Sequence, residues 1–91
     1  MAETETIAAS AVSATDAPTD APREVLDVRS LGPPDPLVET METLPSLAAG
    51  TVLVQVNDRA PQHLFPKLED RGYAHETTNV EGHAVTVIWQ P

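Results

Sequence analysis

The sequence predicts an α/β (α+β) two-layer sandwich with the element order β-α-β-α-β-β. Four short segments alternate apolar and polar residues, two segments between them have helical spacing, and the chain of 91 residues is the size of one small domain. Two helices cover only one face of a four-stranded mixed sheet. We therefore expect both helices on one face and the other face open, with Asp27, Arg29, Gln55 and His75 as candidates for that open face.

Residues 1–22 are predicted to be a disordered acidic Ala/Thr/Pro tail, and residues 23–91 a single domain. The tail has no basic or aromatic residue, and the tetrapeptide TDAP occurs twice, from Thr15 and from Thr19. Such a composition buries too little apolar surface to offset the entropy lost on ordering. A role as a linker or docking arm is the alternative.

The first strand and helix are predicted on either side of a proline-rich corner. Residues 25–29, VLDVR, alternate as a strand does. Asp35 is a good N-cap and Pro36 is favoured at the first helical position. Apolar residues then recur at helical spacing up to Leu44, where Pro45 interrupts the helix.

The second half predicts a strand, a helix and a hairpin. Residues 51–57, TVLVQVN, form the clearest strand, and Asn57 and Asp58 could cap a second helix that ends at Gly72. Residues 73–79 and 83–90 read as an antiparallel hairpin around Gly82. The first two strands are expected to be parallel because a helix connects them.

Composition excludes several classes of function. The formal charge of −9, from fourteen acidic and five basic residues, opposes binding to nucleic acid or to anionic membranes. No segment is long and apolar enough for a membrane helix, and the acidic N-terminus lacks a signal peptide's basic start, so we expect a cytoplasmic protein. The excess of acids over lysine suggests adaptation to molar salt, with an ordinary acidic protein as the alternative.

The corner LGPPDPL and the stretch VNDRAPQHLFPKLEDRGY carry a family resemblance. Over about residues 24–90 the chain resembles the TusA and SirA sulfur carriers. It resembles more closely an uncharacterised relative of theirs, domain-of-unknown-function family 2249, whose N-D-x-x-P turn matches Asn57, Asp58 and Pro61. In the carriers a Cys-Pro-x-Pro motif begins the first helix, and Pro33 stands here at the cysteine position. The chain has no cysteine, so sulfur carriage is excluded.

The resemblance implies an interaction or accessory role around redox or metal-containing enzymes, because members of the uncharacterised family occur beside such proteins. Related carriers present the proline corner to other proteins, which makes it a candidate partner-binding surface. The alternative is a rigid strand-to-helix turn. An interaction module also predicts that Leu53 and Ile88, or other apolar groups, are exposed as a patch on the sheet. The candidate corner residues are Pro33, Pro34, Asp35, Pro36 and Leu37.

A second candidate site is the turn after the strand at 51–57, because ligands favour the carboxyl ends of strands in open α/β sheets. It predicts a concave pocket beside Asn57 for a small ligand or a metal, against the alternative that Asn57 and Asp58 only satisfy the turn. A thiol-less accessory of a sulfur relay is a third possibility. The candidate ligand-binding residues are Asn57, Asp58, Arg59 and His63.

No catalytic pattern supports an enzyme or a cofactor. The histidines, His63, His75 and His83, match no metal motif, although His75 and His83 could become neighbours across the final hairpin. Phe65 and Trp89 are expected to anchor the core.

Overall fold

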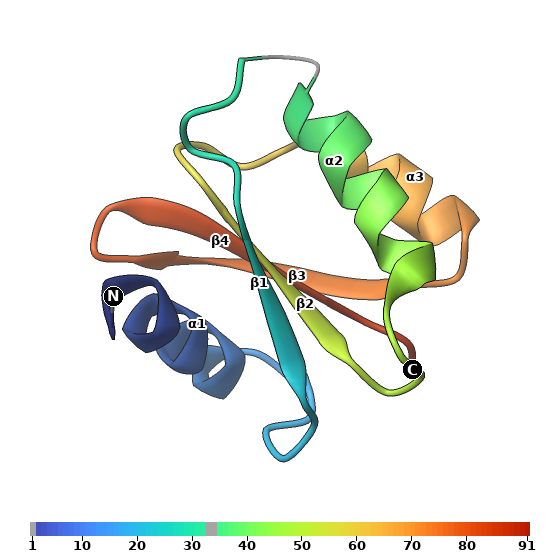
Figure 1. Cartoon of the computed structure of the whole chain (residues 1–91), viewed down its shortest axis with the longest axis horizontal. Helices are drawn as coiled ribbons and strands as arrows, with labels where there is room; N and C mark the ends of the chain where they lie inside the picture. Colours follow the sequence, from blue (N-terminus) through green and yellow to red (C-terminus); the bar gives the residue numbers. More distant parts are fainter. Residues whose placement is uncertain (1, 33–34) are drawn as a thin grey trace.

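The computed structural model describes residues 2–32 and 35–91, and Figure 1 shows its helices and strands. The elements are α1 (Ala2–Ala14), β1 (Arg23–Asp27), α2 (Asp35–Thr43), the 3₁₀ helix η1 (Leu44–Ser46), β2 (Val52–Asn57), α3 (Leu64–Asp70), β3 (Ala74–Val80) and β4 (His83–Trp89). From β1 onward, this is the predicted order of strands and helices. The helix α1 was not predicted.

The four strands form one mixed sheet in the order β1-β2-β4-β3. The strand β1 runs parallel to β2, and β4 pairs antiparallel with both β2 and β3, as the sequence predicted for the first and last strand pairs. Glu81 and Gly82 turn the final hairpin with positive φ values of 52° and 84°. Type I′ hairpin turns require positive φ at both central residues.

The helices α2 and α3 cover one face of the sheet, which we call the leucine face. Its buried cluster consists of Leu44, Leu53, Leu64, Leu68 and Ile88. Leu37 and Met41 of α2 pack against this cluster, as their helical spacing predicted. Leu53 and Ile88 are both 0% exposed, so the expected apolar patch of these two residues on an open sheet face is wrong.

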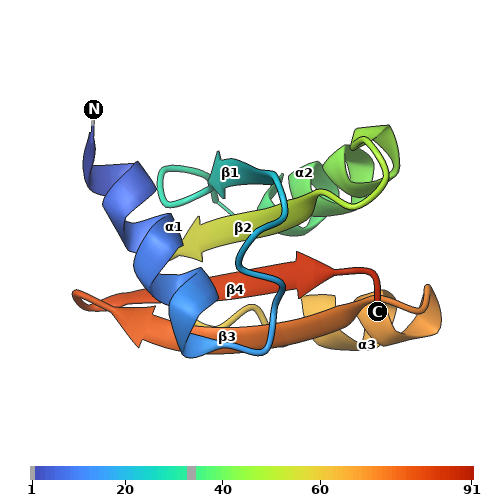
Figure 2. The same cartoon turned by 90° about the horizontal axis from the view of Figure 1, so that it is seen from below.

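The helix α1 covers the opposite face of the sheet, which we call the valine face (Figures 1 and 2). It buries Ile7, Ala8, Ala11 and Val12 against five valines: Val52, Val54, Val56, Val85 and Val87. Two expectations are therefore wrong. Residues 2–14 form a helix and are not part of a disordered tail, and this helix covers the face that was expected to be open, whereas the two predicted helices, α2 and α3, do share one face.

The physical reason lies in the sheet more than in the helix. The spacing of residues 7, 8, 11 and 12 does give one narrow helical face, but two of its four side chains are alanine and the rest of the helix includes Thr and Ser. Burial of the valine face supplies the stabilisation that the segment lacks alone, because most helical stability in proteins comes from packing of an apolar face. Beyond α1, the Asp16 amide donates to Glu76 Oε1 on β3 at 2.6 Å.

Local signals predicted the ends of α2 and α3 well. The helix α2 stops at Thr43, and Pro45 stands in the first turn of η1, where its missing N–H costs no helical bond. The helix α3 ends at Asp70, and Gly72 follows as the predicted C′ residue with a φ of 80°. The Gly72 amide donates to the Glu69 carbonyl at 3.1 Å and the Tyr73 amide to the Leu68 carbonyl at 3.0 Å. This pair of bonds is a Schellman motif.

Candidate functional site

A groove of about 1050 Å³ lies at the carboxyl ends of the parallel strands β1 and β2. One rim is formed by Arg29 and Leu31 after β1 and by Pro36 and Leu37 of α2, and the other is the turn from β2 into α3. Figure 1 shows the ends of β1 and β2 and the start of α2 at the same end of the sheet. The lining residues are Arg29, Leu31, Pro36, Leu37, Asn57, Asp58, Arg59, Ala60, Pro61, Gln62, His63, Leu64 and Lys67. A smaller cavity of about 220 Å³ has no charged residue in its lining.

The groove unites the two candidate sites that the sequence suggested separately. Pro36 and Leu37 of the corner line it. So do all four candidates of the second site: Asn57, Asp58, Arg59 and His63. Asp35 is the first residue of α2 and is exposed, but it does not line the groove. Pro33 and Pro34 lie outside the described residues. A concave surface therefore does lie beside Asn57.

A continuous chain of hydrogen bonds joins the two rims beneath the groove. The Thr40 hydroxyl on α2 donates to the Pro36 carbonyl at 2.8 Å, and Gln55 Nε2 on β2 donates to Thr40 Oγ1 at 2.7 Å. Asn57 Nδ2 then donates to Gln55 Oε1 at 3.4 Å, which is a long bond. Finally the Asp58 amide donates to Asn57 Oδ1 at 2.7 Å.

Because its central members are buried, this chain of hydrogen bonds matters for the stability of the fold. Thr40 and Gln55 are both 0% exposed, and no buried side-chain polar atom lacks a partner within residues 2–32 and 35–91. A buried amide that lost its partner would retain the cost of desolvation, so each bond fixes the position of its neighbours. The sequence analysis missed Thr40 and placed Gln55 on an open face. Its signal was a polar amide on the strand face that carries Leu53.

Asn57 and Asp58 do not cap α3, which corrects the expected capping role. The N-cap of α3 is His63, which makes no side-chain capping bond. Asn57 instead completes the hydrogen-bond chain and turns the backbone at Asp58. Residues 58–63 consequently leave the strand as an irregular segment that forms the second rim. The side chains of Asp58, Arg59 and His63 are exposed there.

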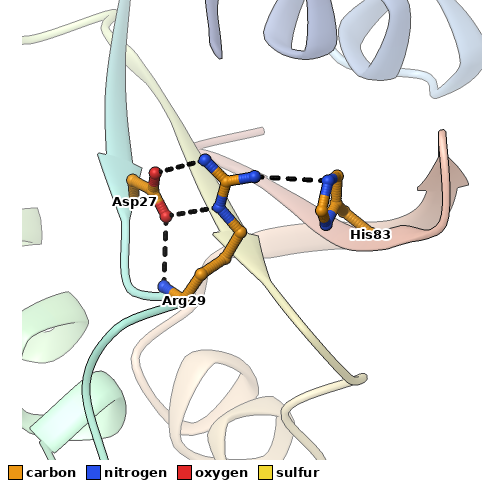
Figure 3. Close-up of polar contacts among 3 residues, drawn as sticks. All are labelled: Asp27, Arg29 and His83. Carbon is orange, nitrogen blue, oxygen red and sulfur yellow. Dashed lines mark hydrogen bonds and ion pairs between the residues drawn. The ribbon is translucent and has the colours of Figure 1, made fainter. Parts of the chain in front are cut away.

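Arg29 lies between two elements at the same end of the sheet (Figure 3). Its Nε donates to Asp27 Oδ1 at 2.9 Å and its Nη2 to Asp27 Oδ2 at 2.7 Å. These bonds to the Arg29 guanidinium lower the pKa of the Asp27 carboxyl. The Arg29 Nη1 lies 3.2 Å from His83 Nε2. Because a guanidinium can only donate, His83 Nε2 accepts here.

The histidines do not converge on a metal site. His75 lies opposite Ile88 and His83 opposite Val80, so the two are not neighbours across the hairpin. His75 stacks on Phe65 of α3, with ring centroids 4.8 Å apart, and its Nε2 lies 3.3 Å from Glu69 Oε2. Phe65 is thus half-buried beside β3 and is not among the fully buried core residues. No cluster of three metal-ligating side chains occurs among the described residues.

None of the described helices is long and apolar enough to cross a membrane. No curated protein and no solved structure matches the chain. Residues 25–90, which include β1 from Val25 onward, β2 to β4 and the whole groove, match the family described as "Uncharacterized conserved protein (DUF2249)". The chain therefore belongs to this uncharacterised conserved family, and α1 lies outside the matched residues.

Proposed function

We propose that the protein is a non-catalytic interaction module that docks a protein partner in the groove between its two rims. The observation that carries this proposal is the union of the two rims in one groove of about 1050 Å³ over a buried hydrogen-bond chain. Such a groove is larger than most pockets for single small molecules, which span roughly 300–1,000 Å³. The buried bond from Gln55 to Thr40 also joins α2 to β2, which favours a preformed groove with a lower entropy cost of docking.

The apolar part of the lining supports docking. Leu31 is one of two large apolar side chains exposed among the described residues, at 37%, and it lines the groove. Leu37 and Pro61 extend this apolar surface on the two rims. The resemblance to sulfur carriers adds support, because those proteins present the corresponding corner to other proteins. The sheet itself is not the proposed surface, since α1 covers its valine face.

The experiment is affinity capture with full-length protein tagged at its C-terminus, in native lysate at molar KCl, followed by reconstitution with the purified partner. The Leu31→Asp variant places a charge in the groove. The Val38→Asp variant is the matched control, because Val38 is 43% exposed on α2 and does not line the groove. We expect loss of the reconstituted complex with Leu31→Asp alone. Equal retention by both folded variants would contradict docking in the groove.

The resemblance directs the first choice of partner to redox enzymes and metalloenzymes, and then to sulfur carriers. A small anionic ligand is the second candidate function. The exposed bases Arg59 and Lys67 favour it, because neither forms an ion pair within residues 2–32 and 35–91. Titration with citrate and with phosphate, followed by the amide resonances of residues 57–64, tests this second function.

A further inference from the structure

We infer that the occupant of the groove is an acidic segment of a protein partner that carries an apolar anchor residue. This inference rests on the proposed docking function and adds the chemistry of the partner. It follows from the distribution of charge over the chain, the apolar surface of the groove and the groove's size.

The groove concentrates positive charge in a strongly negative protein. Three of the chain's five Lys and Arg residues line it, namely Arg29, Arg59 and Lys67. Of the fourteen acidic residues, only Asp58 lines it. The other acidic residues therefore lie outside the groove. An acidic ligand meets attraction in the groove and repulsion elsewhere, which gives the surface its specificity for orientation.

The three bases differ in their availability. Arg29 is held by Asp27 in a two-bond ion pair, so much of its charge is already compensated. Arg59 on the β2–α3 turn and Lys67 on α3 are exposed, and no ion pair joins them to another described residue. Arg59 and Lys67 are therefore the side chains that we assign to the carboxylates of the occupant.

Charge alone does not hold such an occupant. Each exposed ion pair changes a binding constant by only about fivefold at most. At physiological salt the Debye length is about 8 Å. Beyond that distance, screening removes most of the attraction of an acidic occupant to the groove and most of its repulsion from the rest of the surface. The apolar side chain of Leu31, with Leu37 and Pro61 on the two rims, supplies the complementary surface for an anchor such as leucine. The occupant therefore needs both features.

The size and openness of the groove favour a peptide segment over a single metabolite. The volume of about 1050 Å³ lies at the upper limit for small-molecule pockets. The bases and the apolar residues also come from four segments of the chain, so an occupant must extend across both rims to reach them.

The experiment is selection from an unbiased random 12-mer phage library against the immobilised full-length protein. Counter-selection uses the folded Leu31→Asp variant. We expect peptides that combine glutamate or aspartate with a leucine-type residue and that bind the unmodified protein only. Binding of one selected peptide is then measured at 150 mM salt with Arg59→Gln, Lys67→Gln and the double variant. Arg71→Gln is the control, because Arg71 is an exposed base outside the groove.

The expected effects are a weakening of about three- to tenfold for the double Arg59→Gln, Lys67→Gln variant and no change for Arg71→Gln. Replacing the peptide's leucine by serine should weaken binding about tenfold or more. The outcomes separate the two proposals. Groove-dependent peptides without acidic residues would overturn the inference and leave the docking function standing. No groove-dependent peptide at all would overturn both, and tight citrate binding without any peptide would favour a small anionic ligand.

Discussion

Gln55 on the central strand β2 donates a hydrogen bond of 2.7 Å to the hydroxyl of Thr40 on α2, and both side chains are fully buried. This polar contact lies in the leucine face of the sheet. Its apolar neighbours there are Leu53 on β2 and Ile88 on β4. It links the helix that begins at the first rim to the strand that ends at the second rim. The relative position of the rims therefore depends on it.

Removal of one partner of this contact should destabilise the protein. In Thr40→Val the amide of Gln55 loses its acceptor, which should lower the free energy of unfolding by about 1–3 kcal/mol. In Gln55→Leu both the bond to Thr40 and the bond from Asn57 disappear. We expect the double variant Thr40→Val, Gln55→Leu to lose less than the sum of the single variants, because no orphaned group remains between them. Urea unfolding of the four proteins measures this, and strictly additive losses would contradict a shared contact.

Disruption of α1 should expose the valine face. Ile7 is 0% exposed, so Ile7→Asp forces a carboxylate against the valines or detaches the helix. Full burial of an isoleucine side chain contributes about 1.5–3 kcal/mol, and we expect a loss of at least that size. The dye ANS should then bind to the exposed sheet. Ser10→Asp is the control, since Ser10 is exposed on the same helix. Equal behaviour of the two variants would show that α1 does not cover the sheet.

Deletion of residues 1–22 tests whether the part of the chain from residue 23 onward folds without α1. We expect the truncated chain to retain its β circular dichroism but to dimerise or aggregate, because five buried valines become a contiguous apolar surface. Sedimentation velocity at several concentrations checks this. A monomer that binds no ANS would contradict the expectation.

Asp27 should make stability depend on pH in the acidic range. Bonds from Arg29 lower the pKa of the Asp27 carboxyl in the folded protein below its unfolded value. The charged form is therefore stabilised by folding, and this contribution is present above the unfolded pKa of about 3.9 and is lost as pH falls through the lowered folded pKa. Asp27→Asn should reduce stability at neutral pH and remove this part of the acid dependence. The pair is partly exposed, so the effect should be small.

The measurement is thermal unfolding from pH 7 to pH 2, with Glu24→Gln as the control at an exposed position on the same strand. If Asp27→Asn and the unmodified protein lost stability in parallel through the acidic range, the ion pair with Arg29 would not contribute to folding.

Salt should stabilise the protein, in keeping with the composition that suggested adaptation to molar salt. With a formal charge of −9 on 91 residues, mutual repulsion between carboxylates opposes the compact state. Screening shortens the Debye length to about 3 Å at 1 M, so the unfolding midpoint should rise as KCl is added. Sucrose at equal osmolality is the control for preferential exclusion. An unfolding midpoint that does not change with KCl would contradict this prediction.

The sequence predicted the part of the fold in which local chemistry and apolar spacing agree. The Asp35-Pro36 start of α2, the Gly72 end of α3 and the turn at Gly82 each follow from residues that suit one backbone conformation. The strand β1 was expected at residues 25–29 but lies at Arg23–Asp27. Pairing with β2 sets its boundary, and Asp27 is the last residue of β1 that pairs. Local alternation does not specify that register.

The sequence predicted the two rims of the groove as separate candidate sites, but it did not predict the hydrogen bonds that join them. Pro36, Leu37, Asn57 and Asp58 stood out because proline, Asx and turn positions are visible in the sequence. Gln55 and Thr40 did not, because a buried hydrogen bond between residues fifteen positions apart depends on how α2 packs on β2. The helix α1 was missed for a similar reason, since the valine face that orders it is formed by strands β2 and β4.

The direction of β4 determines how the molecule can be attached to something else. Because β4 runs antiparallel to β2, the chain leaves β4 at Trp89 near the end where β2 begins, away from the groove (Figure 1). The six residues of β2 separate the two ends by roughly 20 Å at about 3.3 Å per residue. A biotin, fluorophore or surface linker coupled at Pro91 would thus hold the protein with its groove facing the solution.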